Sequence, residues 1–177
     1  MEAWILALLA YLAPPDRAAV LPAQADNLAT ALAFGPLPFR GPAAAKATAI
    51  ALAVIAHQEG MGFDPRVESC VVTGDQGRTV SLYGLMRGAS WRGHAREDLC
   101  RGGPLPAYLA LLVLAGYAER CPSSGPAGWF RGYSTGSCAV LSDAAAVMCA
   151  RWERLARQHG LVGASCVTRA QPITFAP

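Results

Sequence analysis

The sequence predicts a single domain of the α+β class that is mostly α-helical, with one helix buried at its centre and a small, irregular β-sheet. The chain has 177 residues, 53% of them hydrophobic, and much of that fraction is alanine, which favours packed helices. Segments without proline or glycine lie on both sides of residues 64–86, a segment rich in Val, Thr, Gly and Ser. A chain of this size buries roughly two thirds of its unfolded surface, which is enough for one core.

The first 42 residues predict two helices that pack on the rest of the domain. Residues 4–13 are apolar but too few to span a bilayer. Glu2 stands where a secretory signal would carry basic residues, and no clear cleavage site follows, so we interpret the segment as a packed helix. An atypical signal or export anchor is the alternative. Asp16 can cap a second, alanine-rich helix that runs to about Phe34.

Residues 43–59 predict the central helix. They contain no proline or glycine, and bulky side chains such as Ile50, Leu52 and Ile55 fall on several sides, as expected for a helix surrounded by other helices. Gly60 is expected to end this helix.

The segment up to Met86 predicts two or three short strands, with residues 74–77 (Gly-Asp-Gln-Gly) as the hairpin loop. Helical character returns at residues 105–119 and 141–159, with Ser142 as a possible cap. The order is helices, a small sheet, then helices, without an internal repeat or linker. We therefore expect one domain over residues 1–177, with its core over residues 43–160 and a C-terminal tail over residues 161–177.

Glu59 is the main candidate for chemistry. At the C-terminal end of an apolar helix, the helix dipole and the exclusion of water both disfavour a charged carboxylate. The sequence therefore predicts that Glu59 keeps its proton near neutral pH, which would let it protonate a glycosidic oxygen. An ordinary exposed glutamate at a helix end is the competing interpretation.

The segment after Glu59 carries a second pattern, in which Gly74, Asp75, Gly77 and Arg78 are followed by Thr79, Ser81 and Gly84. Together with Glu59, this pattern resembles the lysozyme-like superfamily, especially soluble lytic transglycosylases and goose-type lysozymes of phages and bacteria. In those families a glutamate ends the central buried helix, and a G-D-x-G-[RK]-S-x-G-x-x-Q segment forms the sheet side of a saccharide cleft. Here Thr79, Ser81 and Gly84 replace the family's Ser, Gly and Gln.

The resemblance covers residues 43–160 and implies a set of site residues. Residues 129–138 resemble the Y-x-x-G-x-C ending of phage and bacterial members, which places Tyr133 opposite the acid. The implied substrate-binding residues are Arg78, Thr79, Ser81, Tyr83 and Tyr133. Trp91 and Trp129 are expected in the core instead.

The resemblance implies cleavage of the β-1,4 bond between N-acetylmuramic acid and N-acetylglucosamine in peptidoglycan, by hydrolysis or transglycosylation. Asp75 is the first candidate for a second carboxylate and Glu68 the next, although Asp75 can equally brace its turn. No cofactor or metal is implied. A protein that binds cell wall without turnover is the alternative, because the family's Gln is missing at position 84.

The charge of the chain bears on its expected partners. The formal charge of +3 suits anionic partners in general, but no run of Lys and Arg resembles a nucleic-acid tract. Arg87, Arg92, Arg96 and Arg101 are interpreted as a solvated face. We expect peptidoglycan strands as the partner, with other virion or secretion-machinery proteins as further candidates. The expected site of action is the periplasm or the cell exterior, reached in a phage virion or by another export route.

Six cysteines lie in the second half of the chain without a C-x-x-C pair, which argues against a zinc ribbon or a thioredoxin-type site. An even, dispersed set indicates disulfides, although six cysteines allow fifteen full pairings. Reach along a helix and an extended tail permits Cys149–Cys166. Cys121–Cys138 and Cys70–Cys100 would complete that set. Free thiols, or a cysteine nucleophile acting with His94, are the alternatives.

Overall fold

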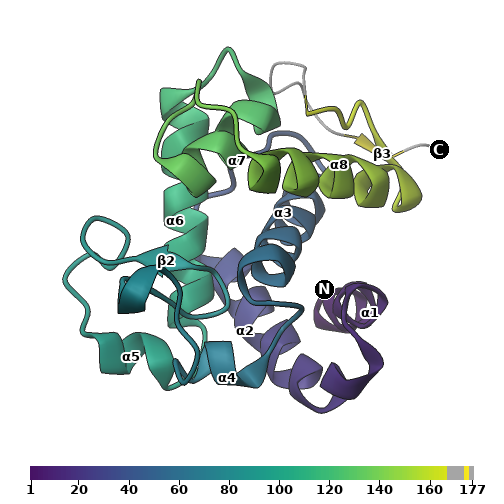
Figure 1. Cartoon of the computed structure of the whole chain (residues 1–177). Coiled ribbons are helices and arrows are strands. Elements are labelled where there is room, and N and C mark those ends of the chain that lie inside the picture. The colour runs from purple at the N-terminus through teal and green to yellow at the C-terminus, as the bar shows by residue number, and fades with distance from the viewer. Residues whose placement is uncertain (167–173, 176–177) are drawn as a thin grey trace. The chain divides into compact units, whose positions relative to one another are not determined.

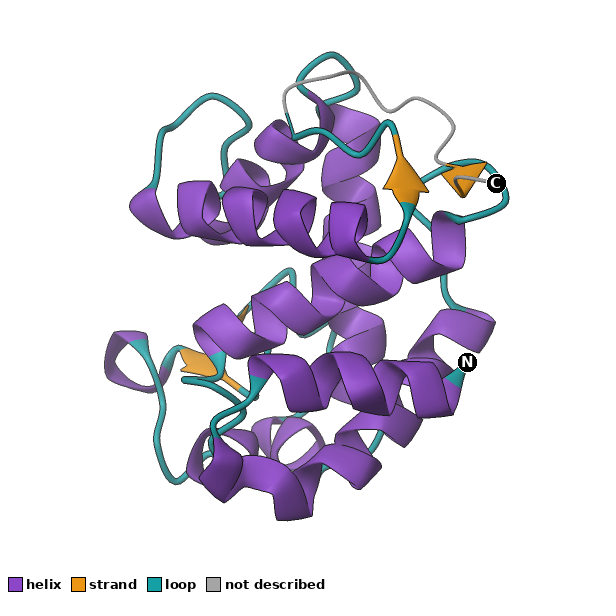
Figure 2. Cartoon of the chain, turned by 90° about the vertical axis from the view of Figure 1, so that its right-hand side faces the viewer, coloured by secondary structure: helices purple, strands orange, loops and turns teal. Residues whose placement is uncertain are grey.

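The computed structural model describes residues 1–166 and 174–175, and helices make up most of this part of the chain (Figure 2). The strands are short and pair in antiparallel fashion. The contacts divide the chain into two compact units. The first comprises residues 1–35 and 55–111, and the second comprises residues 36–54 and 112–177. The prediction of a mostly helical α+β chain with a small sheet is confirmed.

The first unit begins with a helical pair, α1 (Glu2–Leu12) and α2 (Leu21–Phe34), joined by the 3-10 helix η1 (Pro15–Val20) (Figure 1). Ile5, Leu8 and Leu9 of α1 are buried, which confirms that the apolar N-terminal segment is a packed helix. Among the described residues, no helix combines the length and the apolar character that crossing a bilayer requires.

Helix α3 (Ala44–Glu59) runs from the second unit into the first. Every residue from Ala47 to Ala56 is at most 2% exposed, which confirms a helix that is buried all round. Its last residues, from Ile55 onward, belong to the first unit. The helix ends where Gly60 donates its backbone N–H to the carbonyl of Ala56 at 2.9 Å.

The rest of the first unit follows α3 in sequence. Its elements are α4 (Pro65–Glu68), the 3-10 turn η2 (Asp75–Gly77), β1 (Thr79–Val80), β2 (Leu85–Met86), α5 (Arg96–Cys100) and the start of α6 (Leu105–Arg120). Strands β1 and β2 pair with Thr79 opposite Met86 and Val80 opposite Leu85.

The hairpin turn differs from the sequence prediction. Residues 81–84 connect β1 to β2, whereas residues 74–77 close only an isolated antiparallel bridge between Gly74 and Thr79. Both loops contain residues with positive φ, Ser81 at 67° in one and Gln76 at 57° in the other. Turn composition alone therefore did not distinguish the two loops, because both satisfy the same backbone preference.

The second unit is built around aromatic side chains. Its further elements are the end of α6, α7 (Gly125–Thr135), α8 (Asp143–Gln158), β3 (Leu161–Val162) and β4 (Thr174–Phe175). Helices α7 and α8 pack against each other (Figure 1). Phe39 stacks on Trp152 with a centroid distance of 5.0 Å and meets Trp129 edge-on at 5.1 Å. The Trp152 indole donates a hydrogen bond to the carbonyl of Ala47 at 3.1 Å.

Three disulfides join the six cysteines as Cys70–Cys100, Cys121–Cys138 and Cys149–Cys166. The predicted pairing is confirmed. No cysteine is free, which excludes the cysteine-nucleophile alternative. Helix α7 was not predicted, because its sequence opens with Gly-Pro and contains two further glycines.

Candidate functional site

Glu59 is the last residue of α3, and its side chain is half-buried. The carboxyl group therefore stands where a buried helix reaches the surface of the first unit. Gly84, in the hairpin turn that joins β1 to β2, comes close to this side chain. This arrangement brings together the helix end and the strand segment that the sequence pattern singled out.

Gly84 forms the contact with Glu59. A Cβ atom at position 84 would lie 2.8 Å from Oε2 of Glu59 and 3.1 Å from its Cβ, closer than side chains normally approach. The φ of Gly84 is +58°, a left-handed conformation that favours glycine. Only a residue without a side chain lets the acid approach the hairpin in this way.

Gly60 makes a second close approach between the same two elements. A Cβ atom there would lie 2.9 Å from both the carbonyl oxygen and Cδ2 of Leu82. Two glycines thus allow the end of α3 and the turn at residues 81–84 to approach closely, Gly60 against Leu82 and Gly84 against the Glu59 side chain. The Glu59 side chain is therefore packed against the backbone of the turn.

The geometry also bears on the missing glutamine. The sequence pattern placed Gly84 where the resembled families carry Gln, and a side chain at that position would collide with Glu59. An amide group could not line a groove from residue 84 in this backbone. The absence of Gln at this position is a requirement of the local packing.

Asp64 braces the turn that follows Glu59. Its side chain is buried and caps α4 by accepting a hydrogen bond from the backbone N–H of Arg66 at 2.8 Å. The Arg66 guanidinium donates to Oδ2 at 2.7 Å, and the Arg17 guanidinium donates to the same oxygen at 3.3 Å. The side-chain and backbone hydrogen bonds from Arg66, with a smaller contribution from the charge of Arg17, lower the pKa of Asp64 to about 2.

The four residues expected to bind substrate from the hairpin lie in different environments. Arg78 is exposed, and Thr79 is half-buried with its side chain against Gly74. Ser81 and Tyr83 are only 2% and 4% exposed, and the Ser81 hydroxyl accepts a hydrogen bond from the Tyr83 backbone N–H. Burial also raises the pKa of the Tyr83 hydroxyl, and the charge of Glu68 adds to that shift. Both side chains are buried in this structure, so their contact with a substrate stays a prediction.

The candidates for a second carboxylate are Asp75 and Glu68. Asp75 opens the turn η2, and its side chain lies outside the described residues, so its role stays a prediction. Glu68 is half-buried and accepts a short hydrogen bond from the Gln24 side chain. Burial raises the pKa of Glu68, and the bond from Gln24 opposes that shift. This pairing ties Glu68 to α2.

Tyr133 lies on α7, in the second unit, and is half-buried. Glu59 and the hairpin belong to the first unit. The approach of Tyr133 to the acid therefore stays a prediction. Within the described part of the chain, no group of three His, Cys, Asp or Glu side chains gathers as a metal ion would require.

A second feature of the first unit was missed by the sequence interpretation. Gly77 and several residues between 87 and 97 line a pocket of about 560 Å³, Arg87, Trp91 and Arg96 among them. The arginines are exposed and the tryptophan is buried, as the sequence predicted, but the pocket that they line was not predicted. A tryptophan between two arginines in a glycine-containing segment is the sequence signal that could have indicated it.

Comparisons with models of protein families, with curated proteins and with solved structures found no match.

Proposed function

We propose that the protein cleaves the β-1,4 bond between N-acetylmuramic acid and N-acetylglucosamine in peptidoglycan, with Glu59 as the general acid. The observation that carries the proposal is the position of Glu59. It ends a helix in which every residue from 47 to 56 is at most 2% exposed. Its carboxyl group meets the hairpin at Gly84. The carboxyl group therefore packs against the turn at Gly84 and is still partly open to solvent.

The proposed chemistry begins with proton transfer. Glu59 donates its proton to the glycosidic oxygen as the bond from that oxygen to the muramic acid C1 breaks, which gives the N-acetylglucosamine end a hydroxyl group. The resulting positive charge at C1 is then met either by water, which gives hydrolysis, or by the sugar's own C6 hydroxyl, which gives an anhydro end. In both cases the attacking hydroxyl returns a proton to the Glu59 carboxylate.

Three further features support a glycan polymer as the substrate. The order of Glu59, the segment at residues 74–86 and the segment at residues 129–138 resembles the lysozyme-like superfamily. The net charge of +3 favours approach to an anionic cell wall. The three disulfides suit a protein that acts in an oxidising environment outside the cytoplasm.

The test is digestion of purified peptidoglycan by the wild-type protein and by the Glu59→Gln variant. Removing a general acid lowers such rates by about 100- to 10,000-fold, so we expect the variant to release essentially no muropeptides. Glu119→Gln is the matched control, because Glu119 is an exposed glutamate of the second unit, and it should digest like wild type. Mass analysis of the products separates the two reactions, since an anhydromuramyl end is lighter than a hydrolysed end by one water.

Release of muropeptides by a folded Glu59→Gln protein at the wild-type rate would overturn the proposal. Binding to cell wall without release by the wild-type protein would favour the alternative, a wall-binding or virion structural protein. That alternative was motivated by the missing Gln. The packing of Glu59 against Gly84 gives a separate reason for glycine at this position.

A further inference from the structure

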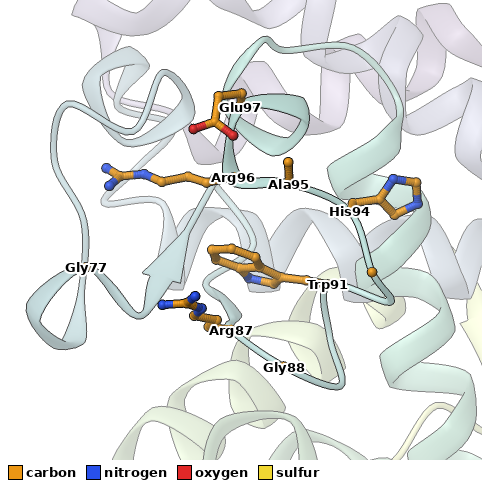
Figure 3. Close-up of a pocket in the computed structure, with 9 residues that line it drawn as sticks. Gly77, Arg87, Gly88, Trp91, His94, Ala95, Arg96 and Glu97 are labelled. Carbon is orange, nitrogen blue, oxygen red and sulfur yellow. The ribbon is translucent and has the colours of Figure 1, made fainter.

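The pocket beside the hairpin is built differently from the Glu59 site. It measures about 560 Å³ and belongs entirely to the first unit. Its residues come from the end of η2, from the loop between β2 and α5 and from the first turn of α5 (Figure 3). The lining residues are Gly77, Arg87, Gly88, Trp91, Gly93, His94, Ala95, Arg96 and Glu97.

Trp91 gives the pocket a fixed apolar surface. Its indole N–H donates a hydrogen bond to the carbonyl of Leu85 at 2.9 Å, so the ring is held to strand β2. Trp91 is 9% exposed and is one of the residues that line the pocket. An aromatic ring held in this way can pack against the aliphatic portion of a ligand.

Two guanidinium groups supply positive charge. Arg87 and Arg96 are both exposed, and in Figure 3 their charged ends extend in the same direction from the loop, whereas the His94 imidazole points the other way. Nη2 of the Arg96 guanidinium also donates a hydrogen bond to the carbonyl of Cys70 at 3.2 Å, which holds the charged end of the side chain in place. A guanidinium group has further N–H donors that can bind a ligand. Guanidinium groups bind carboxylates through paired hydrogen bonds.

Glu97 adds one negative charge to the same pocket. Two arginines and one glutamate leave a formal charge of +1, counted as 2 − 1 with His94 neutral. A ligand with several carboxylates and an amino group complements this set. A polymer of phosphates complements it less well, because Glu97 would repel each phosphate.

The pocket is linked to the proposed catalytic acid through β2. Gly84 contacts Glu59 and immediately precedes β2, and Arg87 immediately follows it, with its backbone N–H bonded to the carbonyl of Arg78 at 2.7 Å. Three residues of chain span at most about 11 Å, so the backbone of the pocket residue Arg87 lies within about that distance of the backbone of Gly84.

We propose that this pocket binds the peptide stem of peptidoglycan, an inference that rests on the proposed glycosidase function. The stem's carboxylates bind Arg87 and Arg96, its amino group binds Glu97, and its aliphatic chain packs on Trp91. Peptide-bearing glycan strands are then preferred over strands without peptides.

The test is a titration of the wild-type protein with a disaccharide–tetrapeptide in which N-acetylglucosamine precedes N-acetylmuramic acid. This probe contains no bond that the proposed reaction cleaves, so binding is measured without turnover. The readout is the NMR signal of the Trp91 indole N–H, identified with a Trp91→Phe variant. We expect the signal to shift with the peptide-bearing probe and to stay in place with the same disaccharide lacking the peptide.

Variants supply the matched comparison. Replacing one charged donor commonly weakens binding by about fivefold to tenfold, so we expect that loss for Arg87→Gln. Arg101→Gln removes the same charge from an exposed position outside the pocket and should bind the probe like wild type.

Equal affinity for the two disaccharides, or unchanged affinity in Arg87→Gln, would overturn the pocket assignment. So would a Trp91 shift produced by poly(glycerol phosphate) and not by the tetrapeptide probe. Because the titration needs no cleavage, a protein that digests peptidoglycan but fails these tests loses only the pocket. A protein that binds the probe as expected but cleaves nothing loses the glycosidase function instead.

Discussion

The carboxyl group of Glu59 lies against the backbone of Gly84, at a distance that leaves no room for a side chain on residue 84. The two residues belong to a buried helix and to a hairpin turn, and neither element alone creates the site. The proposed acid is therefore positioned by a close backbone approach. This relationship makes Gly84 as informative a target as Glu59.

Replacing Gly84 with alanine should lower both stability and activity. A non-glycine residue in the left-handed region costs about 1 to 2 kcal/mol, and the added Cβ must also displace the Glu59 carboxyl group. Misplacing a catalytic group by about 1 Å can cost roughly 100-fold in rate, so we expect a loss of that order. Thermal unfolding and release of muropeptides are the two measurements.

Gly160→Ala is the matched control, because Gly160 has a φ of +71° and nothing lies within 4 Å of the position of its Cβ. It should lose similar stability and keep its rate of digestion. Equal rates in the two alanine variants would show that the contact between Glu59 and Gly84 does not position the acid.

Protonation of Asp64 should make the first unit less stable in acid. Its pKa in the folded protein is about 2, below the ordinary value of 3.8, mainly because of its hydrogen bonds from Arg66. The ionised carboxylate therefore stabilises the fold at pH values above 3.8, and this contribution is lost as the pH falls from 3.8 towards 2. Urea unfolding of wild type and Asp64→Asn at a series of pH values measures it.

We expect the difference in free energy of unfolding between wild type and Asp64→Asn to be largest near neutral pH and to decrease as the pH falls from 3.8 towards 2. A difference that stays constant with pH would mean that the charge on Asp64 contributes nothing to stability. Asp26→Asn, at an exposed aspartate of the same unit, is the comparison variant measured in parallel.

Removing the Cys70–Cys100 disulfide should destabilise the first unit and loosen the pocket. The bond closes a loop with a sequence separation of 30, and a chain-entropy estimate for such a loop is about 3 to 4 kcal/mol. Cys70 also accepts the hydrogen bond from Arg96 through its carbonyl. Guanidinium unfolding of a Cys70→Ser, Cys100→Ser variant measures the loss.

The same variant distinguishes the two proposed sites. Below its unfolding temperature it should digest peptidoglycan through Glu59 while binding the tetrapeptide probe more weakly. An unchanged unfolding midpoint would show that the covalent link adds no stability to this unit.

Helix α3 was predictable because its signal is local. One disulfide was predictable as possible from the distance that the intervening chain can span. Freedom from proline and glycine over residues 43–59, followed by Gly60, indicated a helix and its end. Chain reach permitted Cys149–Cys166, the other two pairs were hypotheses that completed the set, and the structure has all three. Helix α7 was missed, because its glycines are weak helix formers whose presence reflects close packing, as where Gly132 meets the Tyr117 ring.

The candidate site was predictable only in part. The sequence indicated Glu59 and the segment that contacts it, but it placed Ser81 and Tyr83 at the substrate, and both are buried. These two residues were chosen from the family resemblance and from the aromatic character of Tyr83, and neither signal carries information on burial. Ser81 has a φ of +67° and lies in the turn between the two strands.

The sequence by itself determined the helical class and the buried helix ending in Glu59, because composition and helix-breaking residues are properties of the chain. It indicated disulfides through an even number of cysteines but left their pairing open. The tertiary structure alone decided that Gly84 contacts Glu59 and that Arg87, Trp91 and Arg96 share a pocket. These relationships join residues that are distant in sequence or irregular in backbone, and they depend on how closely separate elements approach one another. No local pattern encodes that distance, since it is set by the packing of the whole unit.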